Sequence, residues 1–137
     1  MPVPASSSTE PTLLLIDDDE AMRLCCAGIF RGAGYGFEEA CDGEEGLAQA
    51  ERIKPALILL DVDMPGKDGG EVAREMKADP YLCEKPVLFF TSLISTEEAG
   101  KREVMRGGQP FLAKPVNPTA LVEAVSRLLH PETALTA

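Results

Sequence analysis

The chain has 137 residues, of which 45% are apolar and 26% charged, and its formal net charge at pH 7 is −10. This length and composition fit one globular domain with its own core, and the excess of acid excludes the basic face that a nucleic-acid binder needs. The four cysteines form no CxxC pair and no apolar stretch is long enough to span a membrane, so we expect a cytoplasmic protein with neither nucleic-acid nor membrane partners.

Apolar runs alternate with amphipathic segments along the chain. We expect a flexible leader over residues 1–11, a folded domain over 12–130 and a C-terminal tail over 131–137. The predicted strands are 12–16, 37–40, 56–60, 86–90 and 110–113, and the predicted helices are 20–31, 44–53, 70–78, 97–106 and 118–129. Five strand-then-helix units in succession predict a parallel sheet covered by helices on both faces.

Local signals refine some of these elements. Asn117 followed by Pro118 is typical of a helix N-cap with proline in the first turn. The predicted helix 97–106 carries few apolar residues, so we expect it to be the most loosely docked of the five. Pro110 cannot donate a ladder hydrogen bond, which favours an edge position for the last strand.

Polar residues end the predicted strands. Asp17 and Asp18 follow the first strand, Asp61 the third, Thr91 the fourth and Lys114 the fifth. In a flavodoxin-like strand order of 2-1-3-4-5, the first and third strands are neighbours, so Asp18 and Asp61 should lie close together. Crowded carboxylates recruit a cation, and an open site of oxygen ligands suits Mg²⁺. The set supplies the parts of a phosphoryl-transfer site: a carboxylate nucleophile, a divalent metal, a hydroxyl and a lysine.

Four motifs resemble the receiver domains of two-component response regulators: LIDDD at 15–19, LLDVDMPGKDG at 59–69, FTS at 90–92 and FLAKP at 111–115. The resemblance covers residues 12–130. It implies an α/β fold, a flavodoxin-like (βα)5 three-layer sandwich with a parallel five-stranded sheet in order 2-1-3-4-5. With no linker to a second domain in the sequence, we expect a stand-alone regulator of the chemotaxis-receiver type.

The resemblance also implies a role for each acid. Asp61 would be the phosphoacceptor, taking a phosphoryl group from the phosphohistidine of a sensor histidine kinase or a histidine phosphotransfer protein. Mg²⁺ (or Mn²⁺) would be bound directly by Asp18, Asp61 and the backbone carbonyl of Asp63, and by Asp17 through a water molecule. The protein would be a phosphorelay switch rather than an enzyme, with self-catalysed phosphotransfer and autodephosphorylation at Asp61.

The remaining roles concern the switch. Lys114 would pair with the phosphoryl group and Thr91 would donate a hydrogen bond to it, while Phe111 matches the aromatic switch position. Movement of Thr91 and Phe111 would repack the face formed by the fourth helix, fifth strand and fifth helix of the predicted order, where a downstream protein target would bind. The resemblance also allows a homodimer formed on phosphorylation.

Two other functions fit parts of the sequence. A haloacid-dehalogenase-like phosphatase has an Asp-x-Asp nucleophile motif, which residues 61–63 imitate, but its nucleophile lies on the first strand and its acidic metal pair comes last. An unphosphorylated pseudo-receiver would serve as an interaction module, but the acid, hydroxyl and lysine set is complete here. Gly70 departs from the receiver pattern where a bulky apolar residue is usual, and the effect of the Asp63 side chain on phosphoryl lifetime is left open.

Overall fold

The computed structural model describes residues 11–62, 64, 69–91, 104–106, 109–114 and 117–130. Its centre is a sheet in the order β2-β1-β3-β4-β6-β5. The strands are β1 (Thr12–Ile16), β2 (Gly36–Ala40), β3 (Leu57–Asp61), β4 (Val87–Thr91), β5 (Val104–Arg106) and β6 (Gln109–Ala113). All neighbours are parallel except β5 and β6. The five parallel strands therefore confirm the predicted 2-1-3-4-5 order, and β5 extends the sheet at one edge.

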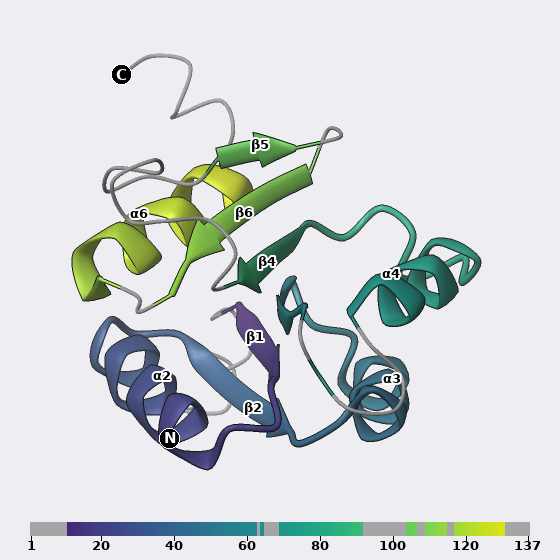
Figure 1. Ribbon diagram of the computed structural model, residues 1–137, viewed down its shortest axis with the longest axis horizontal. Helices are drawn as coiled ribbons and strands as arrows, with labels where there is room; N and C mark the ends of the chain where they lie inside the picture. Colours follow the sequence, from purple (N-terminus) through teal and green to yellow (C-terminus); the bar gives the residue numbers. More distant parts are fainter. Residues whose placement is uncertain are drawn as a thin grey trace, which may run out of the picture.

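The helices are α2 (Glu20–Gly32), α3 (Gly43–Ile53), α4 (Gly69–Lys77) and α6 (Pro118–Leu129). Helices α2 and α6 cover one face of the sheet and α3 and α4 the other, which gives the three predicted layers (Figure 1). None of the described helices has both the length and the apolar character needed to cross a bilayer.

Each face of the sheet has its own apolar core. Along β1, Leu13 and Leu15 pack into the core beneath α2 and α6, whereas Leu14 and Ile16 pack into the core beneath α3 and α4. All four side chains are fully buried. Successive strand residues point to opposite faces, so a strand covered on both sides must be apolar at every position. This explains the unbroken apolar runs that precede Asp17 and Asp61.

Capping side chains set the helix starts. Asp19 caps α2 by accepting from the Ala21 amide, and Asp42 caps α3 by accepting from the Glu45 amide. Asn117 accepts from the Ala120 amide at 3.0 Å, which confirms the predicted cap of α6. These bonds satisfy amides that the first turn of a helix leaves without intrahelical partners.

The predicted helix 97–106 is wrong at its end, because residues 104–106 form β5. This strand runs antiparallel to β6, with Val104 opposite Phe111 and Met105 opposite Pro110. Backbone pairing with β6 prevails over a weak helical pattern with few apolar contacts. The edge position expected for the last parallel strand is also wrong, since β5 covers β6. Pro110 is tolerated there because pairing with β4 begins only at Phe111.

Several predictions fall on residues outside the described set. They include residues 97–103 of the predicted helix, the leader apart from Pro11, and the tail at 131–137. Gly70 is described, and it lies in the first turn of α4.

Candidate functional site

Three carboxylates meet at the carboxyl edge of the sheet. Ile16 of β1 pairs with Leu60 of β3, so the residues that follow them, Asp17 and Asp61, lie side by side on neighbouring strands. One oxygen each from Asp17, Asp18 and Asp61 lies within 4.8 Å of the others. Asp17 is fully buried and Asp61 is 2% exposed, whereas Asp18 faces solvent. The predicted convergence of Asp18 and Asp61 is confirmed.

Lys114 brings a positive charge to the two buried acids. Its Nζ lies 3.3 Å from Asp17 Oδ2 and 3.2 Å from Asp61 Oδ1. Burial of the ammonium favours the neutral amine, but the charges of Asp17 and Asp61 outweigh this effect and raise the pKa of Lys114 above its ordinary value. The backbone amide of Lys114 also donates to the Thr91 carbonyl at 2.9 Å, which ties the lysine to β4.

Thr91 and Phe111 lie on the adjoining strands. Thr91 ends β4, is 3% exposed and pairs with Ala113, the residue before Lys114. Phe111 is partly buried and pairs with Phe89, and their rings stack with centroids 4.8 Å apart. Thr91 and Phe111 are therefore two register positions apart on neighbouring strands. This places the proposed hydroxyl donor and the proposed aromatic switch in one part of the sheet.

The turn after β1 holds the Asp17 carboxylate on both oxygens. The Asp19 amide donates to Asp17 Oδ1 at 2.9 Å, and Lys114 Nζ donates to Oδ2 at 3.3 Å. The Asp18 carboxylate is exposed, and no hydrogen bond or ion pair joins it to the rest of the described structure. The Asp17 carboxylate thus accepts from protein donors on both oxygens, whereas within the described residues no donor occupies the Asp18 carboxylate.

The donor set fits Mg²⁺. Three carboxylates and one ammonium leave two formal negative charges uncompensated, at an edge where one acid reaches solvent. Oxygen ligands with room for water and phosphate oxygens are the surroundings that Mg²⁺ prefers. Asp63, predicted to add its backbone carbonyl, lies outside the described residues. Its role as a ligand stays a prediction.

Two contributions to the site were not foreseen from the sequence. Arg23 Nη1 donates to the Asp17 backbone carbonyl at 2.8 Å, and its Nε donates to Glu39 Oε1 at 2.8 Å. Gly69 begins α4 directly against the end of β3, where an added Cβ would lie 2.6 Å from the Asp61 carbonyl oxygen. Arg23 and Glu39 come together only through the pairing of β1 with β2, so the chain order alone does not reveal them.

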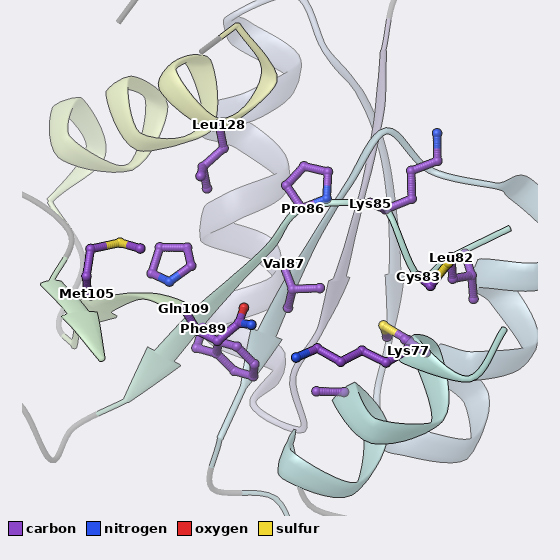
Figure 2. Close-up of a pocket in the computed structure, with 13 residues that line it drawn as sticks. Lys77, Leu82, Cys83, Lys85, Pro86, Val87, Phe89, Met105, Gln109 and Leu128 are labelled. Atoms are coloured by element: carbon purple, nitrogen blue, oxygen red, sulfur yellow. The ribbon is translucent and has the colours of Figure 1, made fainter. Parts of the chain in front are cut away.

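A groove of about 270 Å³ lies away from the acids. Its lining comes from α4, the segment before β4, the strands β4, β5 and β6, and Leu128 of α6, and it includes Lys77 and Lys85 among mainly apolar side chains (Figure 2). Lys85 and Pro86 precede β4, so the groove lies toward the amino end of this strand and Thr91 at the opposite end. Phe89 lines the groove and stacks on Phe111.

Comparison with known proteins agrees with this architecture. A family model described as the response regulator receiver domain matches residues 13–126. A gliding motility regulatory protein from Myxococcus xanthus is 34% identical over 117 residues, and the response regulator PleD from Caulobacter vibrioides is 36% identical over 118 residues. Each alignment covers 85% of this chain, but 15% of the first relative and 25% of the second.

Solved structures extend the likeness to three dimensions. The chemotaxis protein CheY4 of Vibrio cholerae has a TM-score of 0.76 at 28% identity, covering 88% of this chain and 99% of that chain. The receiver domain of the hybrid histidine kinase CckA has a TM-score of 0.70 at 34% identity, covering 86% and 98%. The chain thus matches nearly the whole of these two structures, whereas it spans between 15% and 54% of the curated relatives it matches.

Proposed function

The chain belongs to the response regulator receiver family of two-component signalling, and we propose from this membership that Asp61 is its phosphoacceptor. The observation that carries the proposal is the meeting of Asp17, Asp18 and Asp61 at one edge of the sheet, with Lys114 Nζ between the two buried acids. Receiver domains are phosphoacceptor switches that interact with histidine kinases and downstream targets. The donor would be the phosphohistidine of a sensor kinase or of a histidine phosphotransfer protein.

The transfer itself requires little covalent chemistry from the protein. An Asp61 carboxylate oxygen forms the new bond to phosphorus while the bond from phosphorus to the histidine nitrogen breaks, and the electron pair leaves on the imidazole. The Lys114 ammonium stabilises the charge on the phosphoryl oxygens, and the Thr91 hydroxyl donates a hydrogen bond to one of them. Autodephosphorylation would be attack of a water molecule on the same phosphorus atom, which returns Asp61 to its carboxylate.

The metal would be held by the same edge of the sheet. Asp18 and Asp61 would bind Mg²⁺ directly, Asp63 through its backbone carbonyl, and Asp17 through a bound water molecule. When bound, the ion supplies positive charge that offsets the repulsion between the acids and an incoming phosphoryl group. The exposed Asp18 carboxylate supports this assignment, because the Asp17 carboxylate already accepts from Asp19 and Lys114.

Phosphorylation would act on the sheet beside Lys114. It adds about −1.5 to −2 charges at Asp61. Attraction of Thr91 toward the phosphoryl group would open space that Phe111 can fill. This would repack the surface formed by β6 and α6, which are the fifth strand and fifth helix of the predicted order. A downstream protein that prefers this surface, or a second copy of the chain, would shift the population toward the phosphorylated arrangement. Phe111 is stacked on Phe89, so its movement would break this ring contact.

The phosphoacceptor assignment predicts that Asp61→Asn abolishes labelling. The amide lacks the anionic oxygen that attacks phosphorus, whereas Asp79→Asn changes an acid of the turn before β4, whose carboxylate accepts from the Tyr81 amide, and should label like wild type. The measurement is intact-protein mass spectrometry after incubation with acetyl phosphate and Mg²⁺. Full labelling of Asp61→Asn would overturn the assignment. Steady hydrolysis of a generic phosphate ester by the wild-type protein would favour the phosphatase alternative.

A further inference from the structure

Asp17 is held at its backbone as well as at its carboxylate. Its amide donates to the Ala40 carbonyl of β2 at 3.1 Å, and its own carbonyl accepts from Arg23 Nη1 at 2.8 Å. The first bond continues the pairing of β1 with β2. The second comes from a side chain in the first turns of α2, so one arginine joins the end of β1 to the helix that follows.

The bond from Arg23 acts on the peptide that leads into Asp18. A peptide group is planar, so fixing the carbonyl oxygen of Asp17 also fixes the direction of the Asp18 amide. The Asp18 side chain has no hydrogen bond or ion pair of its own within the described part of the chain, and its carboxylate is exposed. Among the described contacts, the backbone of Asp18 is therefore what holds its carboxylate beside Asp61.

Arg23 is itself firmly anchored. Its Nε donates to Glu39 Oε1 at 2.8 Å, and its side chain is 15% exposed against 38% for Glu39. The planar guanidinium offers several donors in a fixed fork, so a single side chain can bind a carboxylate and a carbonyl at the same time. Glu39 lies on β2 opposite Leu15 of β1. The strand pairing therefore holds the carboxylate where Arg23 needs it.

We propose that Arg23 is a positioning residue that orients Asp18 for Mg²⁺ by holding the Asp17 carbonyl, with Glu39 as its anchor. The inference rests on the proposed function, because it deepens the metal site that Asp61 uses. Mg²⁺ demands near-ideal octahedral geometry, so a ligand free to rotate binds it less tightly. Loss of residues that orient metal ligands typically weakens metal affinity by about 10- to 100-fold.

The test is a titration of the full chain with Mg²⁺ alone. The amide chemical shifts of residues 17–19 are measured at each Mg²⁺ concentration and give the dissociation constant. Arg23→Met keeps an apolar stem but removes both donors, and we expect it to raise the Mg²⁺ dissociation constant by about 10-fold or more. Arg31→Met is the matched control, because Arg31 also lies on α2 and donates to a backbone carbonyl, that of Phe37, at 3.2 Å. It should leave the dissociation constant unchanged.

The direction of the change in Mg²⁺ affinity distinguishes a positioning role of Arg23 from a purely electrostatic one. Removing a positive charge near an acidic site strengthens cation binding by Coulomb attraction, so tighter Mg²⁺ binding by Arg23→Met would overturn the proposal. An unchanged dissociation constant, or an equal loss in Arg31→Met, would overturn it as well. Should Arg23→Met fail to fold by circular dichroism, Arg23→Lys keeps the charge and one donor and should still weaken Mg²⁺ binding. A wild-type affinity for Arg23→Lys would then count against the proposal.

The two proposals fail in different ways. Labelling of Asp61→Asn would remove the phosphoacceptor assignment, whatever the Mg²⁺ affinity of the arginine variants. Normal Mg²⁺ binding by Arg23→Met would remove the positioning role and leave the Asp61 assignment untouched.

Discussion

The ionisation of Lys114 contributes to the stability of the fold. Its ammonium lies within 3.3 Å of an oxygen of Asp17 and of Asp61. Their charges raise its pKa despite the opposing effect of burial. A lysine whose pKa is higher in the folded than in the unfolded chain stabilises the fold below the unfolded pKa of about 10.4. That contribution disappears as the pH rises through the folded pKa.

We predict that the stability difference between wild type and Lys114→Met is largest near neutral pH and shrinks above about pH 10.4. The measurement is the free energy of unfolding in urea of both proteins, taken from pH 7 to pH 11 without Mg²⁺. Lys85→Met serves as the control, because Lys85 is exposed and forms no ion pair in the described structure. A difference for Lys114→Met that stays constant with pH would contradict the linkage.

The cysteines differ in reactivity for reasons set by burial. Cys26 is fully buried, and burial, with smaller contributions from Cys25 and Asp17, raises the pKa of its thiol to about 12. Cys25, Cys41 and Cys83 are exposed. Because the thiolate is the reactive form, we predict that iodoacetamide at pH 8 alkylates the exposed cysteines of the folded protein and spares Cys26. Cys41 should react more slowly than its exposure suggests, because a hydrogen bond with Glu45 raises the pKa of its thiol. Peptide mass spectrometry would identify the modified sites, and rapid labelling of native Cys26 would contradict the packing around it.

At the scale of elements, the helices differ in how closely they approach the sheet. Gly46 of α3 is buried against Ile16 of β1, and an added Cβ would clash with the Ile16 side chain. Gly28 of α2 is exposed, and a Cβ there would meet nothing within 4 Å. The two glycines occupy similar helical backbone but opposite surroundings. This provides a matched pair of substitutions.

We predict that Gly28→Ala stabilises the protein by about 0.5–1 kcal/mol, because alanine has the higher helix propensity. Gly46→Ala should destabilise it, since overpacking typically costs about 1–3 kcal/mol and outweighs the same gain in propensity. Thermal or urea unfolding of the two variants would test both signs. Stabilisation by Gly46→Ala would show that α3 does not pack as closely on β1 as the structure describes.

The elements also show what the sequence could and could not predict. The acid-terminated strands and the order of the parallel sheet were predictable, because continuous apolar runs and strand-helix alternation have few other solutions. The strand at 104–106 was not, because its pairing depends on β6 rather than on its own pattern. The contact of Arg23 with Glu39 joins residues 16 positions apart, and it follows from strand register, which sequence patterns do not specify.

At the scale of the whole molecule, parallel topology brings distant segments to one edge. Helices α2, α3 and α4 return the chain between successive strands from β1 to β4, and β6 runs parallel to β4. All five parallel strands therefore begin at the same side of the sheet, and the polar residues after β1, β3, β4 and β6 share the opposite side. Two separate cores support this edge from both faces. The acidic cluster and the groove lie toward opposite ends of β4. Phe89, two residues before Thr91 on this strand, lines the groove and stacks on Phe111.

The bond between Lys114 and Asp17 joins residues 97 positions apart. Contacts of such long sequence separation form late and raise the contact order of a fold, which slows folding. A chain still emerging from the ribosome, with β6 not yet made, would contain the acids but not the ammonium that pairs with them. The edge that carries both the acids and their ammonium therefore exists only once β6 has been made and has paired with β4.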